Sequence, residues 1–195
     1  MKKYLLLSLF LLWISSGVYA YTTTDLQSAT YLSQKWYIVD NSASPVNYRF
    51  EDNVTRKEIM KVIAKIGGDT VSEKCEGKFS DVANDWGCKY IEWALGKWII
   101  AANATFRPDD NITRAEAIKM ILKVKWVTNT YSGSVWQENY MNTAFDKCYI
   151  SSATNYNQNA QRKWIFNAAY NVENTTTCDP NAEIDDILGD LFDLF

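Results

Sequence analysis

The chain of 195 residues contains no histidine. It therefore has no Ser–His–Asp set and lacks the imidazole ligand that many zinc sites use. The spacing of its four cysteines matches no common zinc motif, so we expect no metal site. Acidic pairs such as Asp109 and Asp110 are explained by turn and helix-entry roles, and nothing in the sequence indicates two carboxylates that face each other across a cleft. The sequence favours a protein that is not an enzyme and needs no cofactor.

Basic residues are not in excess either. Lys and Arg number 20 against 23 Asp and Glu, and the net charge is −3. Nucleic-acid-binding domains usually carry a clear basic excess, so we expect no nucleic-acid partner. The acids gather in residues 179–195, a stretch without Lys or Arg, and the rest of the chain is close to neutral.

One marked apolar run lies in residues 1–20. It follows Lys2 and Lys3 and ends in small residues at Val18 and Ala20, a pattern typical of a cleavable signal peptide. The run is short for a membrane span, and no later segment is apolar for long enough. We expect a secreted protein with no membrane span after cleavage. An uncleaved N-terminal anchor is the alternative.

The chain also repeats itself. FRPDDNITRAEAIKMI begins at Phe106, YRFEDNVTRKEIMKVI begins at Tyr48, and a diverged copy, YNQNAQRKWIFNAAY, begins at Tyr156. The copies align on Arg56, Arg114 and Arg162, which are 58 and 48 residues apart. A repeat at this period indicates an architecture of stacked supersecondary units.

Each of the first two copies starts a helix with a capping box. In Thr55-x-x-Glu58 and Thr113-x-x-Glu116, the threonine oxygen would accept from the third backbone N–H and the glutamate would reach back to the threonine N–H. The third copy has Gln161 in place of the threonine, so we expect its helix to begin less firmly. An apolar stripe follows in all three copies and predicts one buried helix face, with these members: Ile59, Met60, Ile63, Ala64; Ala117, Ile118, Ile121, Leu122; Ile165, Phe166, Ala169, Tyr170.

A further helix precedes each capped helix. In the second copy it is predicted from Trp86 to Ile100, and the equivalents start at Leu26 and Trp136. One helix–loop–helix unit cannot bury its apolar face alone, whereas three stacked units can. We therefore expect an all-α fold of three repeats: residues 21–68 with a shortened N-terminal half, residues 69–127, and a degenerate third over residues 128–178.

The second copy resembles the S-layer homology (SLH) family. The resemblance rests on FSDV at Phe79, FRPDD at Phe106 and ITRAE from Ile112 to Glu116. The first copy lacks the leading F-x-D element, and the third keeps only the arginine of T-R-A-E. The resemblance implies three repeats packed as a pseudo-threefold bundle. It also implies a module at the bacterial cell surface, cell wall or S-layer that binds a secondary cell-wall polysaccharide or peptidoglycan in grooves between repeats.

The same resemblance implies that the arginines face an acidic sugar substituent such as a pyruvate ketal. Arg56 and Arg114 follow a helix cap directly, where free N–H groups and the helix dipole favour an anion and a guanidinium adds a two-pronged clamp. We expect at most two competent grooves, around these two residues, with the third repeat and Arg162 mainly closing the stack. Asp81 of FSDV is a further binding candidate. The alternatives are solvent-exposed arginines and an aspartate that caps the turn into the next helix.

Export makes disulfides the expected state of the cysteines. Four cysteines allow three pairings. We favour Cys75–Cys88, which brackets the FSDV loop, and Cys148–Cys178, which would tie the end of the third repeat to its own first helix. Free, buried thiols are the alternative.

Residues 179–195 form an acidic, amphipathic tail. It either caps the repeat stack or docks on another surface protein. For the whole chain, the alternative to polysaccharide binding is a structural or assembly protein of the cell envelope, whose repeats bind other surface proteins. The degenerate third copy favours that alternative.

Trp36 and Trp98 stand where the SLH family usually has glycine at the end of a helix. Glycine enters the left-handed region without penalty, and tryptophan does not. Two interpretations are open. Either the helix ends differently and the indole packs in the core, or the codon is UGA, which some bacteria read as glycine.

Overall fold

The computed structural model describes residues 23–38, 47–175 and 178, and in this part of the chain it contains six α-helices and no β-strand. The all-α prediction is confirmed. The predicted signal peptide, residues 1–20, and the acidic tail, residues 179–195, lie outside the described residues. The helices are α1 (Thr23–Gln34), α2 (Arg56–Ile66), α3 (Cys88–Gly96), α4 (Arg114–Val124), α5 (Trp136–Asp146) and α6 (Arg162–Asn174).

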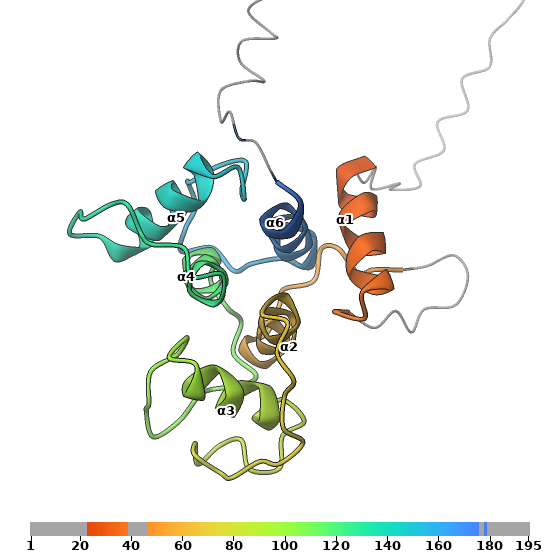
Figure 1. Cartoon of the computed structure of the whole chain (residues 1–195), viewed down its shortest axis with the longest axis vertical. Helices are drawn as coiled ribbons and strands as arrows, with labels where there is room; N and C mark the ends of the chain where they lie inside the picture. Colours follow the sequence, from red (N-terminus) through yellow and green to blue (C-terminus); the bar gives the residue numbers. More distant parts are fainter. Residues whose placement is uncertain (1–22, 39–46, 176–177, 179–195) are drawn as a thin grey trace, which may run out of the picture.

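Three inner helices, α2, α4 and α6, contact one another, and each carries one outer helix (Figure 1). Helix α3 packs on α2, α5 packs on α4, and α1 packs on α6. Each of the first two pairs joins the capped helix of one predicted repeat to the leading helix of the next. The pair α1–α6 joins the two ends of the described chain. There the hydroxyls of Tyr31 and Tyr37 donate to the two carboxylate oxygens of Glu173, each at 2.9 Å.

The inner helices supply most of the core. Eleven of the twelve residues of the predicted apolar stripes are buried, and the twelfth, Tyr170, is half-buried. Full burial of each isoleucine or phenylalanine contributes about 1.5–3 kcal/mol. Around Tyr170 the packing is aromatic, since its ring meets that of Tyr31 edge-on with centroids 5.2 Å apart.

Both predicted capping boxes are present. Glu58 accepts from the Thr55 N–H at 2.7 Å, and Glu116 accepts from the Thr113 N–H at 3.0 Å. The two threonine hydroxyls accept the backbone N–H of the same glutamates in return. Helix α6 has Gln161 at its N-cap with no side-chain capping bond, as its sequence predicted.

The loops ahead of the inner helices form a closed ring of hydrogen bonds. Val54 donates to the Ala160 carbonyl at 2.9 Å, Ala160 donates to the Ile112 carbonyl at 2.8 Å, and Ile112 donates to the Val54 carbonyl at 3.0 Å. Each of these residues lies one position before a helix N-cap. The ring therefore holds the starts of α2, α4 and α6 together at the centre of the molecule.

The two favoured disulfides are present and the alternative of free thiols is wrong. Cys75 bonds to Cys88, with Cα atoms 5.7 Å apart, and Cys148 bonds to Cys178, with Cα atoms 5.5 Å apart. Cys88 opens α3, and Cys148 lies just after α5. The second bond therefore fastens the segment after α6 to the end of α5.

The outer helix α3 is shorter than predicted, so that Trp86 and Trp98 both lie outside it. Trp36 and Trp98 adopt φ angles of 59° and 60° and are 74% and 84% exposed. The interpretation that their indoles pack in the core is therefore wrong. None of the described helices has the length and apolarity needed to cross a membrane.

Candidate ligand-binding grooves between the helices

The N-termini of the three inner helices are already occupied. The backbone N–H groups of Arg56, Arg114 and Arg162 donate to loop carbonyls at 2.8–2.9 Å, and the residue after each arginine does the same at 3.0–3.1 Å. The acceptors are the carbonyls of Asp110 and Pro108, Gln158 and Tyr156, and Asp52 and Phe50. The expectation of free N–H groups for an anion is therefore wrong, because the loop ahead of another inner helix satisfies them.

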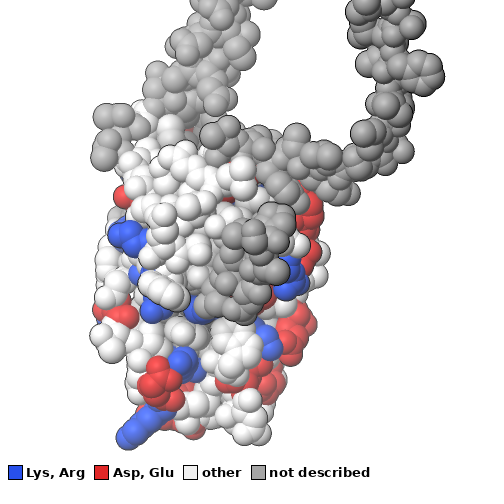
Figure 2. All heavy atoms as spheres, turned by 90° about the vertical axis from the view of Figure 1, so that its right-hand side faces the viewer, with Lys and Arg blue, Asp and Glu red and all other residues white. Residues whose placement is uncertain are grey.

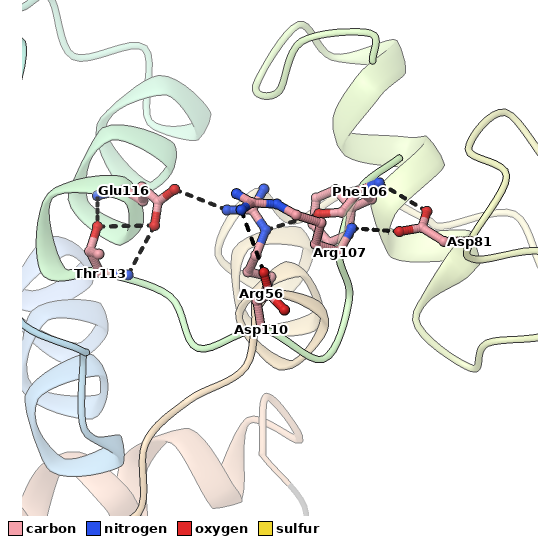
Figure 3. A network of polar contacts seen from close by, with 7 residues as sticks. All are labelled: Arg56, Asp81, Phe106, Arg107, Asp110, Thr113 and Glu116. Carbon is pink, nitrogen blue, oxygen red and sulfur yellow. Dashed lines mark hydrogen bonds and ion pairs between the residues drawn. The ribbon is translucent and has the colours of Figure 1, made fainter. Parts of the chain in front are cut away.

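The Arg56 side chain ties two predicted repeats together (Figure 3). Its Nη1 donates to Glu116 Oε1 at 3.1 Å, and its Nε donates to the Phe106 carbonyl at 3.0 Å. The guanidinium carbon lies 4.7 Å from the centre of the Phe106 ring, and the side chain is only 12% exposed. Burial lowers the pKa of Arg56, and Glu116 opposes that shift. Glu116 thus caps α4 and neutralises Arg56 at the same time.

Arg162 and Arg114 are placed similarly but have different partners. Arg162 Nε donates to the Tyr48 carbonyl at 2.8 Å. The Arg114 guanidinium lies 5.5 Å from the Trp164 ring, and its buried Nε has no hydrogen-bond partner among the described residues. Burial lowers the pKa of both groups. Trp164 holds the position in α6 that Glu116 holds in α4, so Arg114 faces an indole instead of a carboxylate.

Asp81 supports the loop against which Arg56 packs. Its two carboxylate oxygens accept from the backbone N–H groups of Phe106 at 2.9 Å and Arg107 at 2.7 Å (Figure 3). Burial raises the pKa of Asp81, but these backbone hydrogen bonds outweigh it and bring the pKa below its ordinary value. Asp81 therefore fixes the loop that leads to α4. The sequence had suggested Asp81 as a binding candidate, with a cap on the turn into the next helix as the alternative.

Two grooves between the helices share a set of four equivalent side chains. One, of about 290 Å³, is lined by Arg162, Glu58, Lys61 and Trp86 among others. The other, of about 220 Å³, is lined by the equivalent set Arg56, Glu116, Lys119 and Trp136. In each groove the glutamate belongs to a capping box, and the lysine lies three residues further along the same helix. Trp136 opens α5, and Trp86 lies two residues ahead of α3.

Each groove contains a half-buried lysine that no described carboxylate neutralises. Lys61 and Lys119 are half-buried, and neither forms an ion pair with any described residue. Burial, above all, lowers the pKa of both. Lys119 Nζ lies 4.5 Å from the centre of the Trp136 ring. Trp86 and Trp136 are 51% and 38% exposed, so each groove also offers an aromatic surface to solvent.

The third interface between inner helices, that of α4 with α6, has a different set of side chains. Asn167 stands in α6 where α4 has Lys119, and its amide donates to Asp25 in α1 at 2.7 Å. Arg114, which belongs to this interface, lines neither of the two grooves. The grooves thus lie at Arg56 and Arg162, although the sequence had suggested Arg56 and Arg114.

Four of the groove residues were not predicted from the sequence: Lys61, Lys119, Trp86 and Trp136. A signal was present, since Lys61 and Lys119 are separated by the same 58 residues as Arg56 and Arg114. On the face that Figure 2 shows, basic and acidic side chains lie interspersed over the described part of the chain. On that face an anion would therefore meet individual cations and not a broad basic surface.

The family model of the S-layer homology domain matches residues 78–118. This segment contains the FSDV and FRPDD elements, helix α3 and the capping box of α4, so the match supports the resemblance for the predicted second repeat. A comparison with curated proteins gave no match. S-layer homology domains are non-catalytic modules that anchor proteins to the cell wall. The match therefore supports a surface-binding role and a cell-surface location.

Proposed function

We propose that this protein is a secreted, non-catalytic anchoring module that binds an anionic cell-wall polymer in the two grooves. A secondary cell-wall polysaccharide with acidic substituents such as pyruvate ketals is the preferred ligand, and peptidoglycan is the alternative polymer. One observation carries the proposal: the set of Arg, capping-box Glu, half-buried Lys and exposed Trp occurs twice in equivalent grooves.

Each member of the set has a distinct role in this proposal. The lysine pairs with a carboxylate of the polymer, because it has no carboxylate partner within the described residues. A half-buried pair is screened by salt less than an exposed one. The tryptophan packs against the apolar face of a sugar ring. The arginine and the glutamate hold the groove walls in place and contribute mainly through position.

The proposal includes three repeats arranged about a pseudo-threefold axis, over residues 21–68, 69–127 and 128–178. The ring of hydrogen bonds through Val54, Ile112 and Ala160 supports this arrangement, because the three residues are equivalent in the sequence and each donates to another member of the ring. The different composition at Arg114 supports two working grooves and a third interface that closes the molecule.

A pull-down on purified cell-wall sacculi tests the proposal. The double variant Lys61→Ala with Lys119→Ala removes the available cation from both grooves. Loss of a hydrogen bond to a charged group typically costs about 1.5–3 kcal/mol, so we expect binding to fall roughly tenfold or more. The matched control is Lys65→Ala with Lys125→Ala, which removes two exposed lysines, one in the last turn of α2 and one at the C-cap of α4. Equal binding by both double variants would show that the grooves are not the site.

The arginines are less informative targets. Arg56→Ala with Arg114→Ala removes contacts that hold α2, α4 and α6 together, so a loss of binding would follow from a loss of folding as well. If that variant remained folded and bound as well as the parent, the arginines would have no part in binding.

An assembly role is the second candidate. The observation that favours it is the third interface, in which Trp164 and Asn167 replace the glutamate and lysine of the grooves. In that case the repeats, or the tail over residues 179–195, would contact another surface protein. Retention of a protein partner from the same envelope, together with no binding to sacculi, would select this role.

A further inference from the structure

Three tryptophans adopt a backbone conformation that belongs to glycine. Trp36, Trp98 and Trp126 have φ angles of 59°, 60° and 57°. Each lies at the end of a helix, and the N–H of the residue after it donates to the carbonyl five positions back, at 2.9–3.0 Å. This is the Schellman motif, whose left-handed residue is usually glycine, because a Cβ atom is penalised there.

The chain provides its own comparison for one of them. Gly68 precedes Trp126 by 58 residues, the same interval that relates Arg56 to Arg114. It ends α2 as Trp126 ends α4, with a φ angle of 71°. A Cβ atom on Gly68 would meet no atom within 4 Å. Steric room therefore does not restrict the residue type at this position. The left-handed backbone conformation is what favours glycine.

The three indoles gain little that would offset the conformational cost. They are 74%, 84% and 83% exposed. The other described tryptophans are Trp86, Trp93, Trp136 and Trp164, and none of these four has a positive φ angle. Each of the four contacts other side chains: Trp86 and Trp136 line the grooves while staying partly exposed, Trp164 lies beside Arg114, and Trp93 packs against the core.

Each of the remaining non-glycine residues with positive φ angles has a partner or a residue type that supports this conformation. Arg49 and Arg107 each pair with an aspartate three residues on, within the turn that leads to a helix cap. Asn155, at the equivalent turn, is a residue type that tolerates this conformation. Cys148 ends α5 in the same Schellman motif, with the Tyr149 N–H donating to the Ala144 carbonyl at 2.9 Å, but its disulfide with Cys178 holds it in place. Among the described residues, the unsupported cases are the three tryptophans.

We infer that positions 36, 98 and 126 are glycine in the protein that the cell makes, and that their shared codon is UGA read as glycine. The other four described tryptophans, Trp86, Trp93, Trp136 and Trp164, are encoded by UGG and remain tryptophan. Removal of three exposed indoles would leave Trp86 and Trp136 as the well-exposed indoles of the described chain. This inference rests on backbone conformation and is independent of the proposed ligand.

Peptide mass spectrometry of the protein purified from the cells that naturally produce it tests the inference. Lys35, Lys97 and Lys125 precede the three positions, so trypsin releases peptides that begin at residues 36, 98 and 126. The last of these also contains Trp136, which serves as an internal control. We expect glycine at all three positions and tryptophan at 136. Tryptophan at any of the three positions, or glycine at 136, would overturn the inference.

Recombinant variants of the full chain test the physical argument separately. Trp98→Gly and Trp126→Gly remove the left-handed penalty, and each should raise Tm by roughly 2–8 °C. Trp98→Ala and Trp126→Ala are the matched controls, because alanine also removes the indole but keeps the Cβ atom. We expect Tm to rise in the glycine variants only. An equal rise in Tm with alanine, or no rise with glycine, would show that the backbone conformation is not what disfavours tryptophan.

Discussion

Replacement of Arg56 by methionine should destabilise the fold, since this arginine joins α2 to the loop and helix of the next predicted repeat. Methionine keeps the apolar stem of the side chain and removes the guanidinium with its donors. The variant loses the bond to Glu116 at 3.1 Å, the bond to the Phe106 carbonyl at 3.0 Å, and the contact of the guanidinium with the Phe106 ring. Glu116 keeps its capping role through its other carboxylate oxygen.

The size of the effect follows from these contacts. A hydrogen bond that involves a charged group contributes about 1.5–3 kcal/mol. The variant loses the stabilisation from two such bonds and from the ring contact. Part of this loss in the free energy of unfolding is offset, because the guanidinium no longer has to be buried. We expect a net loss of about 2–3 kcal/mol in the free energy of unfolding, which corresponds to a fall in Tm of roughly 4–12 °C.

Thermal and urea unfolding of the purified chain measure this loss. Arg107→Met is the control, because that side chain is 61% exposed and its ion pair with Asp110 is long, at 3.5 Å. An exposed pair of this kind contributes about 0–1 kcal/mol. Glu116→Gln completes a double-mutant cycle, since glutamine can still serve in a capping box. Equal effects of the Arg56 and Arg107 variants, or no coupling between Arg56 and Glu116, would refute the assignment of Arg56 as an interhelix tie.

Three further predictions concern stability. Thr113→Ala removes the cap of α4 and should lower the free energy of unfolding by about 0.5–2 kcal/mol in urea, and an unchanged value would contradict the capping role. Cys148→Ser with Cys178→Ser opens a loop of 30 residues and should cost about 3–4 kcal/mol on the chain-entropy estimate, measured by the same titration. Because the folded-state pKa of Asp81 is lowered, its contribution is present above the ordinary value of 3.8 and is lost as the pH falls through the lower folded-state value. Thermal unfolding from pH 5 to pH 2 should therefore show a weaker pH dependence in Asp81→Asn, and an identical dependence would exclude this role.

The local parts of the fold could be predicted from the sequence. A capping box involves residues three positions apart, so Thr113 and Glu116 are sufficient to indicate where α4 begins. The apolar stripes are equally local, and they correctly gave the buried faces of α2, α4 and α6. Both disulfides were the favoured pairing among the three that four cysteines allow, one bracketing the FSDV loop and the other joining the end of the third repeat to its own first helix.

The candidate site could be predicted only in part, because its geometry depends on loops that are distant in sequence. The N–H of Arg56 is free in an isolated α2 but is satisfied by the Asp110 carbonyl in the folded chain. The repeat pattern likewise does not reveal that α3 packs on α2, and this pairing is what brings Trp86 into the same groove as Lys61. The left-handed conformation of Trp126 could have been predicted from the repeat, because Trp126 aligns with Gly68 at the interval of 58 residues.

The pairing of α1 with α6 sets an order of events during synthesis. Tyr31 and Glu173 are 142 residues apart, so at 5–20 residues per second α1 leaves the ribosome roughly 7–28 s before its partner exists. The pairs α2–α3 and α4–α5 join segments that are close in sequence, and they can form while the rest is still being made. Until α6 has been made, Ala29 and Leu32 of α1 are exposed to water, although both are fully buried in the folded chain. We therefore expect the docking of α1 on α6 to be the last step of folding. Before that step, the undocked α1 is the segment on which a chaperone or a protease would act first.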